Sequence, residues 1–98
     1  MAKLEGLLGI SLRAGQAIFG EDSCMKALRG NQCDALVMDE AISDTVRRKY
    51  EGVCERAGTV CSVLPEGTIE QATGKPGMAM AIRKGTLGKQ IADLLRQN

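Results

Sequence analysis

Leucine residues near the start of the chain recur at the spacing of one helical face. The positions are Leu4, Leu7, Leu8 and Leu12. Charged and small residues lie between them, so the pattern predicts an amphipathic helix from about residue 2 to residue 14. Gly15 follows and is a typical helix end.

Four short apolar runs further along the chain predict strands. They are Ala17–Phe19, Ala35–Met38, Thr59–Val63 and Met78–Ile82. Helical patterns separate them: one opens at Gly20 and stops at Gly30, one is capped by Ser43 and ends at Gly58, one runs from Pro65 to Thr73, and the last carries Leu87, Ile91, Leu94 and Leu95. This alternation predicts an α/β fold, with helices on both faces of a sheet of mostly parallel strands.

The length of 98 residues predicts one domain over 1–98. Its predicted core includes Leu8, Leu12, Leu28, Val37, Val53, Val60, Ile82 and Ile91. With 44% hydrophobic and 26% charged residues, the composition is that of a folded globular protein. The chain contains neither an apolar run of the roughly 20 residues that span a membrane nor an N-terminal pattern typical of a signal peptide. We therefore expect a cytoplasmic protein.

The formal net charge is +1, from 13 Lys and Arg against 12 Asp and Glu. This balance neither indicates nor excludes a nucleic-acid partner, because a local basic patch can act while acids gather elsewhere.

Four cysteines raise the question of a metal or a disulfide. They are Cys24, Cys33, Cys54 and Cys61. No two are spaced as Cys-x-x-Cys, and the chain has no histidine to complete a zinc site. We expect four reduced thiols that pack as small hydrophobic groups.

Catalysis finds little support in these residues. Histidine, the commonest general base near neutral pH, is absent. Asp39 and Glu40 are adjacent at the end of a predicted strand, so their side chains should point to opposite faces. The segment 74–77 lacks the earlier glycine and the following Ser or Thr of a phosphate-binding loop. The sequence therefore predicts no enzyme, no catalytic residues and no cofactor.

The start of the second helix is the best candidate for a binding site. Gly20, Glu21, Asp22 and Ser23 open this helix, and Lys26 and Arg29 follow one and two turns later. Free N–H groups and short polar side chains at a helix start can enter a groove, while basic residues contact phosphates. The two aromatic residues of the chain are too few for a base-stacking platform. The same residues also fit an ordinary capped surface helix, which the residues alone favour.

Six stretches share their order and spacing with a known family. They are residues 8–21, 25–30, 35–43, 47–49, 54–55 and 72–76, which read LGISLRAGQAIFGE, MKALRG, ALVMDEAIS, RRK, CE and ATGKP. In these stretches the chain resembles the L-seven-Ae ribosomal family, in particular its short bacterial, YlxQ-like branch. The resemblance implies a three-layer α/β/α sandwich with a four-stranded mixed sheet. It also implies binding to kink-turn RNA, an internal bend flanked by sheared G·A pairs.

The family's second helix begins with Gly-x-Asn-Glu, and a lysine follows three residues later. Gly20 and Lys26 match this pattern, whereas Asp22 and Ser23 replace the Asn and Glu that read base edges. The replacement matters because an amide donates and accepts hydrogen bonds, whereas an ionised Asp only accepts them.

Two further segments of the chain match the family. Lys75–Pro76 corresponds to a basic Arg-Pro pair before the last strand, and Glu40 to an acidic residue after the second strand, although Ala41 replaces the Asp that commonly follows. The RNA-binding residues expected from the helix start and the resemblance together are Gly20, Glu21, Asp22, Ser23, Lys26, Arg29, Glu40, Lys75 and Pro76. The implied partners are structured RNA and ribosome-associated proteins. A protein-interaction module on the same fold that has lost RNA binding remains the alternative.

Overall fold

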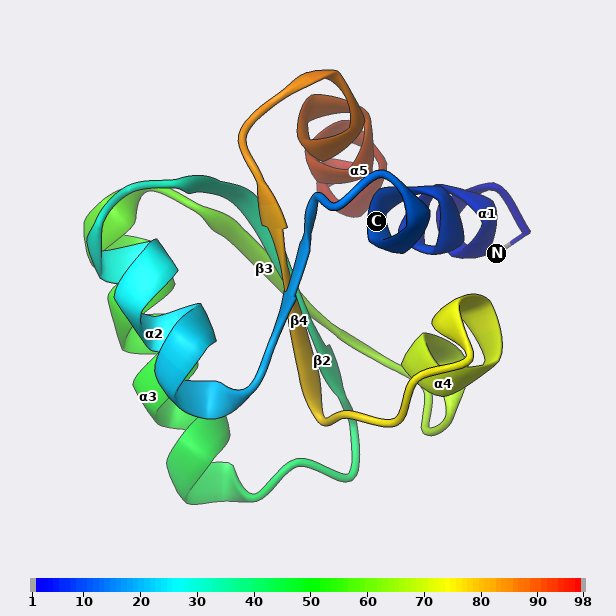
Figure 1. Cartoon of the computed structure of the whole chain (residues 1–98). Coiled ribbons are helices and arrows are strands. Elements are labelled where there is room, and N and C mark those ends of the chain that lie inside the picture. The colour runs from blue at the N-terminus through cyan, green and yellow to red at the C-terminus, as the bar shows by residue number, and fades with distance from the viewer. Residues whose placement is uncertain (1, 98) are drawn as a thin grey trace.

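A computed structural model of the chain describes residues 2–97 as alternating helices and strands (Figure 1). The elements are α1 (Ala2–Arg13), β1 (Ala17–Phe19), α2 (Glu21–Arg29), β2 (Cys33–Asp39), α3 (Asp44–Ala57), β3 (Val60–Leu64), α4 (Thr68–Thr73), β4 (Ala79–Arg83) and α5 (Thr86–Arg96). The predicted element order is confirmed. The clearest difference from the prediction is the start of α4, which begins at Thr68 rather than at Pro65.

The residues before α4 form a turn because the backbone there is held from outside the helix. The Thr68 N–H donates to the Pro65 carbonyl at 3.1 Å. The Gly67 N–H donates instead to a carboxylate oxygen of Asp39 at 2.9 Å. The prediction that Pro65 lies in the first turn of this helix was therefore wrong, because Pro65 begins the turn that precedes the helix.

The four strands form a mixed sheet in the order β1-β4-β2-β3. β2 and β3 are parallel, with Ala35 opposite Val60, whereas β4 runs antiparallel to both β2 and β1. The expectation of mostly parallel strands was wrong. The physical reason is the shortness of α4, whose six residues rise only about 9 Å. A five-residue strand is roughly 17 Å long, so the chain does not return to the start of β3 before it enters β4.

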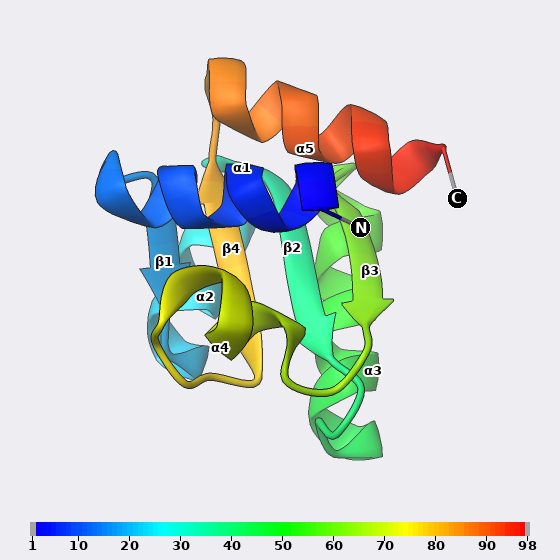
Figure 2. The same ribbon diagram turned by 90° about the vertical axis from the view of Figure 1, so that its right-hand side faces the viewer.

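Helices cover both faces of this sheet, which confirms the three-layer α/β/α sandwich. α2 and α3 lie on one face, and α1, α4 and α5 lie on the other (Figures 1 and 2). Alternate residues of the central strand β2 pack into two separate hydrophobic cores. Leu36 and Met38 point towards α2 and α3, while Ala35 and Val37 point towards the other helices. This period of two is the geometry of a strand buried on both faces.

Most of the predicted core is buried. Leu8, Leu28, Val37, Val53, Ile82 and Ile91 are each at most 3% exposed. Leu12 and Val60 are only half-buried. Three of the four cysteine thiols are buried and the fourth, Cys61, is half-buried, and none is in a disulfide among the residues described. No helix within residues 2–97 has the length and apolar character needed to cross a bilayer.

Candidate functional site

Four connections of the chain meet at one edge of the sheet, the lower edge in Figure 1. This lower edge consists of Gly20 between β1 and α2, residues 40–43 between β2 and α3, residues 65–67 between β3 and α4, and residues 74–78 between α4 and β4. It therefore holds the beginning of α2 and the Lys75–Pro76 loop, two segments more than 50 positions apart in the sequence.

A pocket of about 250 Å³ lies at this lower edge. Its lining comes from the β1–α2 junction, the start of α3 and the loop before β4: Phe19, Gly20, Glu21, Ile42, Val46, Tyr50, Pro76, Gly77, Met78 and Ala79. Most of these residues are apolar, and Glu21 alone among them carries a charge. A hollow of this kind can receive a flat apolar group whose edge meets the polar start of α2.

The backbone at the start of α2 depends on a glycine. Gly20 adopts φ 92°, ψ 136°, a conformation that L side chains rarely take. No side chain caps the start of this helix. Glu21, Asp22 and Ser23 are all exposed in the first turn. Their polar groups are thereby presented to solvent beside the pocket.

The two basic residues predicted on α2 lie at different places. Lys26 is exposed one turn beyond the first-turn residues, within reach of a large ligand at the lower edge. Arg29 lies in the last turn, about 12 Å along the axis from Glu21. It contributes to another hollow with Arg56, so the structure separates Arg29 from the other candidate residues.

The adjacent carboxylates Asp39 and Glu40 both hold backbone of the lower edge. Buried Asp39 accepts hydrogen bonds from the N–H groups of Ala41 at 2.8 Å and Gly67 at 2.9 Å. Exposed Glu40 accepts from the Glu66 N–H at 3.1 Å. The two side chains therefore brace the β3–α4 turn against the end of β2. Asp39 was not among the predicted site residues, and its position at the polar end of an apolar strand was the only available signal.

The Lys75–Pro76 loop packs against the end of β1. The Lys75 ammonium lies over the Phe19 ring, 4.7 Å from its centroid. A methyl group added at Gly77 would come within 3.0 Å of the same ring, so glycine permits the close approach. Pro76 is exposed at the mouth of the pocket. Phe19 thus places the predicted loop residues beside the predicted helix start.

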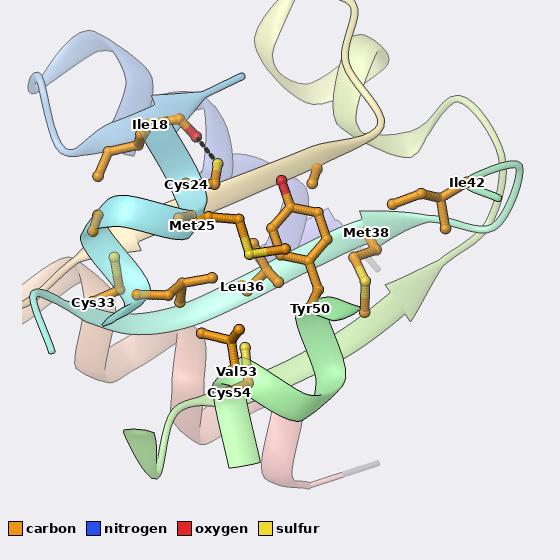
Figure 3. Close-up of a cluster of buried hydrophobic side chains, with 14 residues drawn as sticks. Ile18, Cys24, Met25, Cys33, Leu36, Met38, Ile42, Tyr50, Val53 and Cys54 are labelled. Atoms are coloured by element: carbon orange, nitrogen blue, oxygen red, sulfur yellow. Dashed lines mark hydrogen bonds between the residues drawn. The ribbon is translucent and has the colours of Figure 1, made fainter. Parts of the chain in front are cut away.

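Tyr50 forms the floor of the pocket from the α3 side, and Figure 3 shows it among the buried side chains of that layer. Burial raises the pKa of its phenol well above the ordinary value, so the ring is neutral at physiological pH. Close by, the Cys24 thiol donates to the Ile18 carbonyl at 3.2 Å, which ties α2 to β1 (Figure 3).

Sequence reasoning also missed Ile42 and Met78, which line the pocket from two loops. Met78 is 47% exposed, a high value for so large an apolar side chain. A signal for both residues was present in the sequence. Each is a large apolar residue in a predicted loop, Ile42 close to Glu40 and Met78 close to Lys75–Pro76.

Acidic and basic side chains are mixed at the lower edge. The exposed acids are Glu21, Asp22, Glu40, Asp44 and Glu66, and the cations nearby are Lys26, Lys75 and, near the start of α3, Arg47, Arg48 and Lys49. Lys49 forms an exposed ion pair with Glu21 at 3.5 Å, which contributes little stability. A ligand at this edge must therefore be recognised by shape and hydrogen bonds more than by general charge.

No family model and no curated protein matches the chain. Among solved structures, a protein of unknown function from Bacillus halodurans is similar over 98% of this chain and 99% of that chain, with 21% identity and a TM-score of 0.89. A 15.5 kD RNA-binding protein from Giardia lamblia is similar over 98% of this chain and 84% of that chain, with 16% identity and a TM-score of 0.79. These likenesses define the class of fold to which the chain belongs.

Proposed function

We propose that the protein binds structured RNA of the kink-turn kind at the lower edge. The observation that carries the proposal is the pocket that joins the start of α2 to the loop before β4. An unstacked base could enter this hollow while the exposed groups of the first α2 turn meet the edges of neighbouring bases. The fold similarity to an RNA-binding protein and the sequence resemblance to the L-seven-Ae family both support this assignment.

Five of the predicted residues take a part in this proposal. Lys26 and Lys75 contact phosphates, since both are exposed cations close in the chain to lining residues of the pocket, on α2 and in the loop before β4. Asp22 and Ser23 read base edges, Asp22 by accepting from an amino group such as that of cytosine. Glu40 acts through the backbone, because its carboxylate holds the turn at Glu66.

The proposed role is one of binding, in a ribosome-associated, cytoplasmic setting, without catalysis or cofactor. The buried carboxylate Asp39 accepts two backbone hydrogen bonds, which favours a structural part for it over acid-base chemistry. An RNA-binding accessory protein needs no further reactive group.

A second candidate function has a specific observation in its favour. Glu21 and the 47% exposed Met78 both line the pocket, and four further exposed acids lie at the same edge of the sheet. Such a surface suits a basic protein segment with an apolar anchor. A protein-interaction module is therefore the alternative that the experiment must separate.

The test is a titration of the protein with a kink-turn stem and with a plain RNA duplex of equal length, at several salt concentrations. We expect tighter binding to the kink-turn. Lys26→Ala should weaken that binding and lower the salt slope by about one unit. Asp22→Asn should strengthen it, because the amide restores a donor and removes a charge that repels phosphate. Lys3→Ala, on α1 at the other face of the sheet, is the charge-matched control.

Equal affinity for both RNAs in the wild type and in the Asp22→Asn variant would overturn the proposal. The interaction-module function would then take its place.

A further inference from the structure

The edge of the sheet opposite the candidate site is rich in basic side chains. This upper edge in Figure 1 consists of residues 29–31 at the end of α2, residues 56–59 at the end of α3, and residues 84–89 at the β4–α5 junction. We propose that it is a second, independent nucleic-acid surface that binds the phosphate backbone of duplex RNA. The inference goes beyond the proposed function, because it invokes no kink-turn and none of the lower-edge residues.

Two adjoining hollows form a continuous surface along the upper edge. The first, of about 320 Å³, lies between Arg29 and Arg56. The second, of about 450 Å³, is lined by Lys84, Lys89 and Arg96. Asn31 and Ala57 line both hollows, so the five cations face one shared depression rather than scattered patches.

Positive charge dominates this depression. Its lining includes five basic side chains and two acidic ones, Asp34 and Asp93. Asp93 pairs with Arg96 at 3.5 Å, and Asp34 accepts the Gly85 N–H at 2.9 Å. Within residues 2–97, the other four cations form no ion pair. Four exposed charges thus remain available for an anionic partner.

Favourable interaction with helix dipoles explains the positions of only some of these cations. Arg29 and Arg56 lie in the last turns of α2 and α3, where cations favour the helix dipole. Lys84 precedes α5 and Lys89 lies in its first turn, where a positive charge is unfavourable and no acidic residue is present. The two lysines therefore need another reason, and an anion bound in the depression supplies one.

The shape and chemistry of the depression favour a nucleic-acid backbone over other polyanions. The cations come from three connections and are spread across the edge, as a row of phosphates requires. The apolar residues of the lining are small or buried, namely Cys33, Val53, Ala57 and Ala92, so the depression offers no exposed anchor for a hydrophobic peptide or a lipid tail.

The experiment measures binding of a plain RNA duplex to the intact protein at several salt concentrations. The double variant Lys84→Ala/Lys89→Ala should bind more weakly and lower the slope of log affinity against log salt by about two units. Arg29→Ala/Arg56→Ala should act in the same direction. The matched control Lys3→Ala/Arg48→Ala removes the same charge from exposed sites outside the depression and should lower the slope by less than one unit. Melting temperatures check that every variant is folded.

Failure of this inference is distinguishable from failure of the proposed function. If the wild type binds the duplex but shows no preference for the kink-turn, only the lower-edge proposal is contradicted. The upper-edge inference is overturned if the wild type shows no salt-dependent duplex binding, or if the control double variant loses as much as Lys84→Ala/Lys89→Ala. Tighter binding of poly-glutamate than of the duplex would also overturn it, in favour of an acidic protein partner.

Discussion

The Lys75 ammonium lies 4.7 Å from the centroid of the Phe19 ring. This contact joins the loop before β4 to the last residue of β1, directly before Gly20 and α2. A cation over an aromatic face at an exposed site contributes roughly 0.5–1 kcal/mol. Its importance here is positional, because it sets the distance between the two halves of the candidate site.

Two substitutions at this contact separate charge from position. Lys75→Ala removes a phosphate-binding cation, so we expect weaker kink-turn binding and a salt slope lower by about one unit. Phe19→Leu keeps the charge but removes the ring against which Lys75 and Gly77 pack. It should weaken binding with an unchanged salt slope. Titrations at several salt concentrations measure both effects, and wild-type affinity in Phe19→Leu would refute the positional role.

Asp39→Ala should destabilise the protein by about 2 kcal/mol, because it leaves the Ala41 and Gly67 N–H groups without their carboxylate partner. Urea unfolding monitored by circular dichroism measures the change. Asp44→Ala is the control, since this exposed carboxylate forms only a surface ion pair with Arg47. Equal free energies of unfolding for the two variants would show that Asp39 does not brace the β3–α4 turn.

Val37→Ala should lower the free energy of unfolding by roughly 1–3 kcal/mol, because it opens a cavity beside the fully buried centre of β2. Val63→Ala in the neighbouring strand β3 is the matched control, since Val63 is 41% exposed and its loss leaves no cavity. Denaturant midpoints report both effects. A larger loss in Val63→Ala than in Val37→Ala would contradict the assignment of β2 as the central strand.

The four thiols should differ in reactivity in the native protein. The neighbouring Cys54 thiol lowers the pKa of half-buried Cys61, so its reactive thiolate forms at a lower pH than that of an ordinary cysteine. Burial raises the pKa of Cys33 to about 11, so this thiolate forms only at high pH. Brief alkylation at pH 8 followed by mass spectrometry should find Cys61 modified first.

Two measurements check that order. Cys54→Ala removes the neighbouring thiol and should slow the alkylation of Cys61, and preferential labelling of Cys33 in the native protein would contradict the assignment. Denatured under non-reducing conditions, the wild type should titrate four thiols.

Much of the secondary structure is determined locally, and the sequence therefore predicts it. The apolar run at 35–38 indicates a buried strand, and its alternate residues do enter two cores. Ser43 was predicted as a cap, and its hydroxyl accepts the Val46 N–H at 3.3 Å. These features depend on periodicity and on hydrogen bonds between residues a few positions apart, so the printed sequence contains the necessary information.

The direction of β4 and the composition of the lower edge depend on distant parts of the chain. The shortness of α4 makes β4 antiparallel to its neighbours, which brings the Lys75–Pro76 loop to the start of α2. The pocket and the Phe19–Lys75 contact follow from that placement. Arg29 is the opposite case. It is only eight positions from the start of α2 in the sequence, yet it lies at the other edge of the sheet. A sequence specifies which residues lie close along the chain, whereas packing of the helices and the sheet decides which residues meet across it.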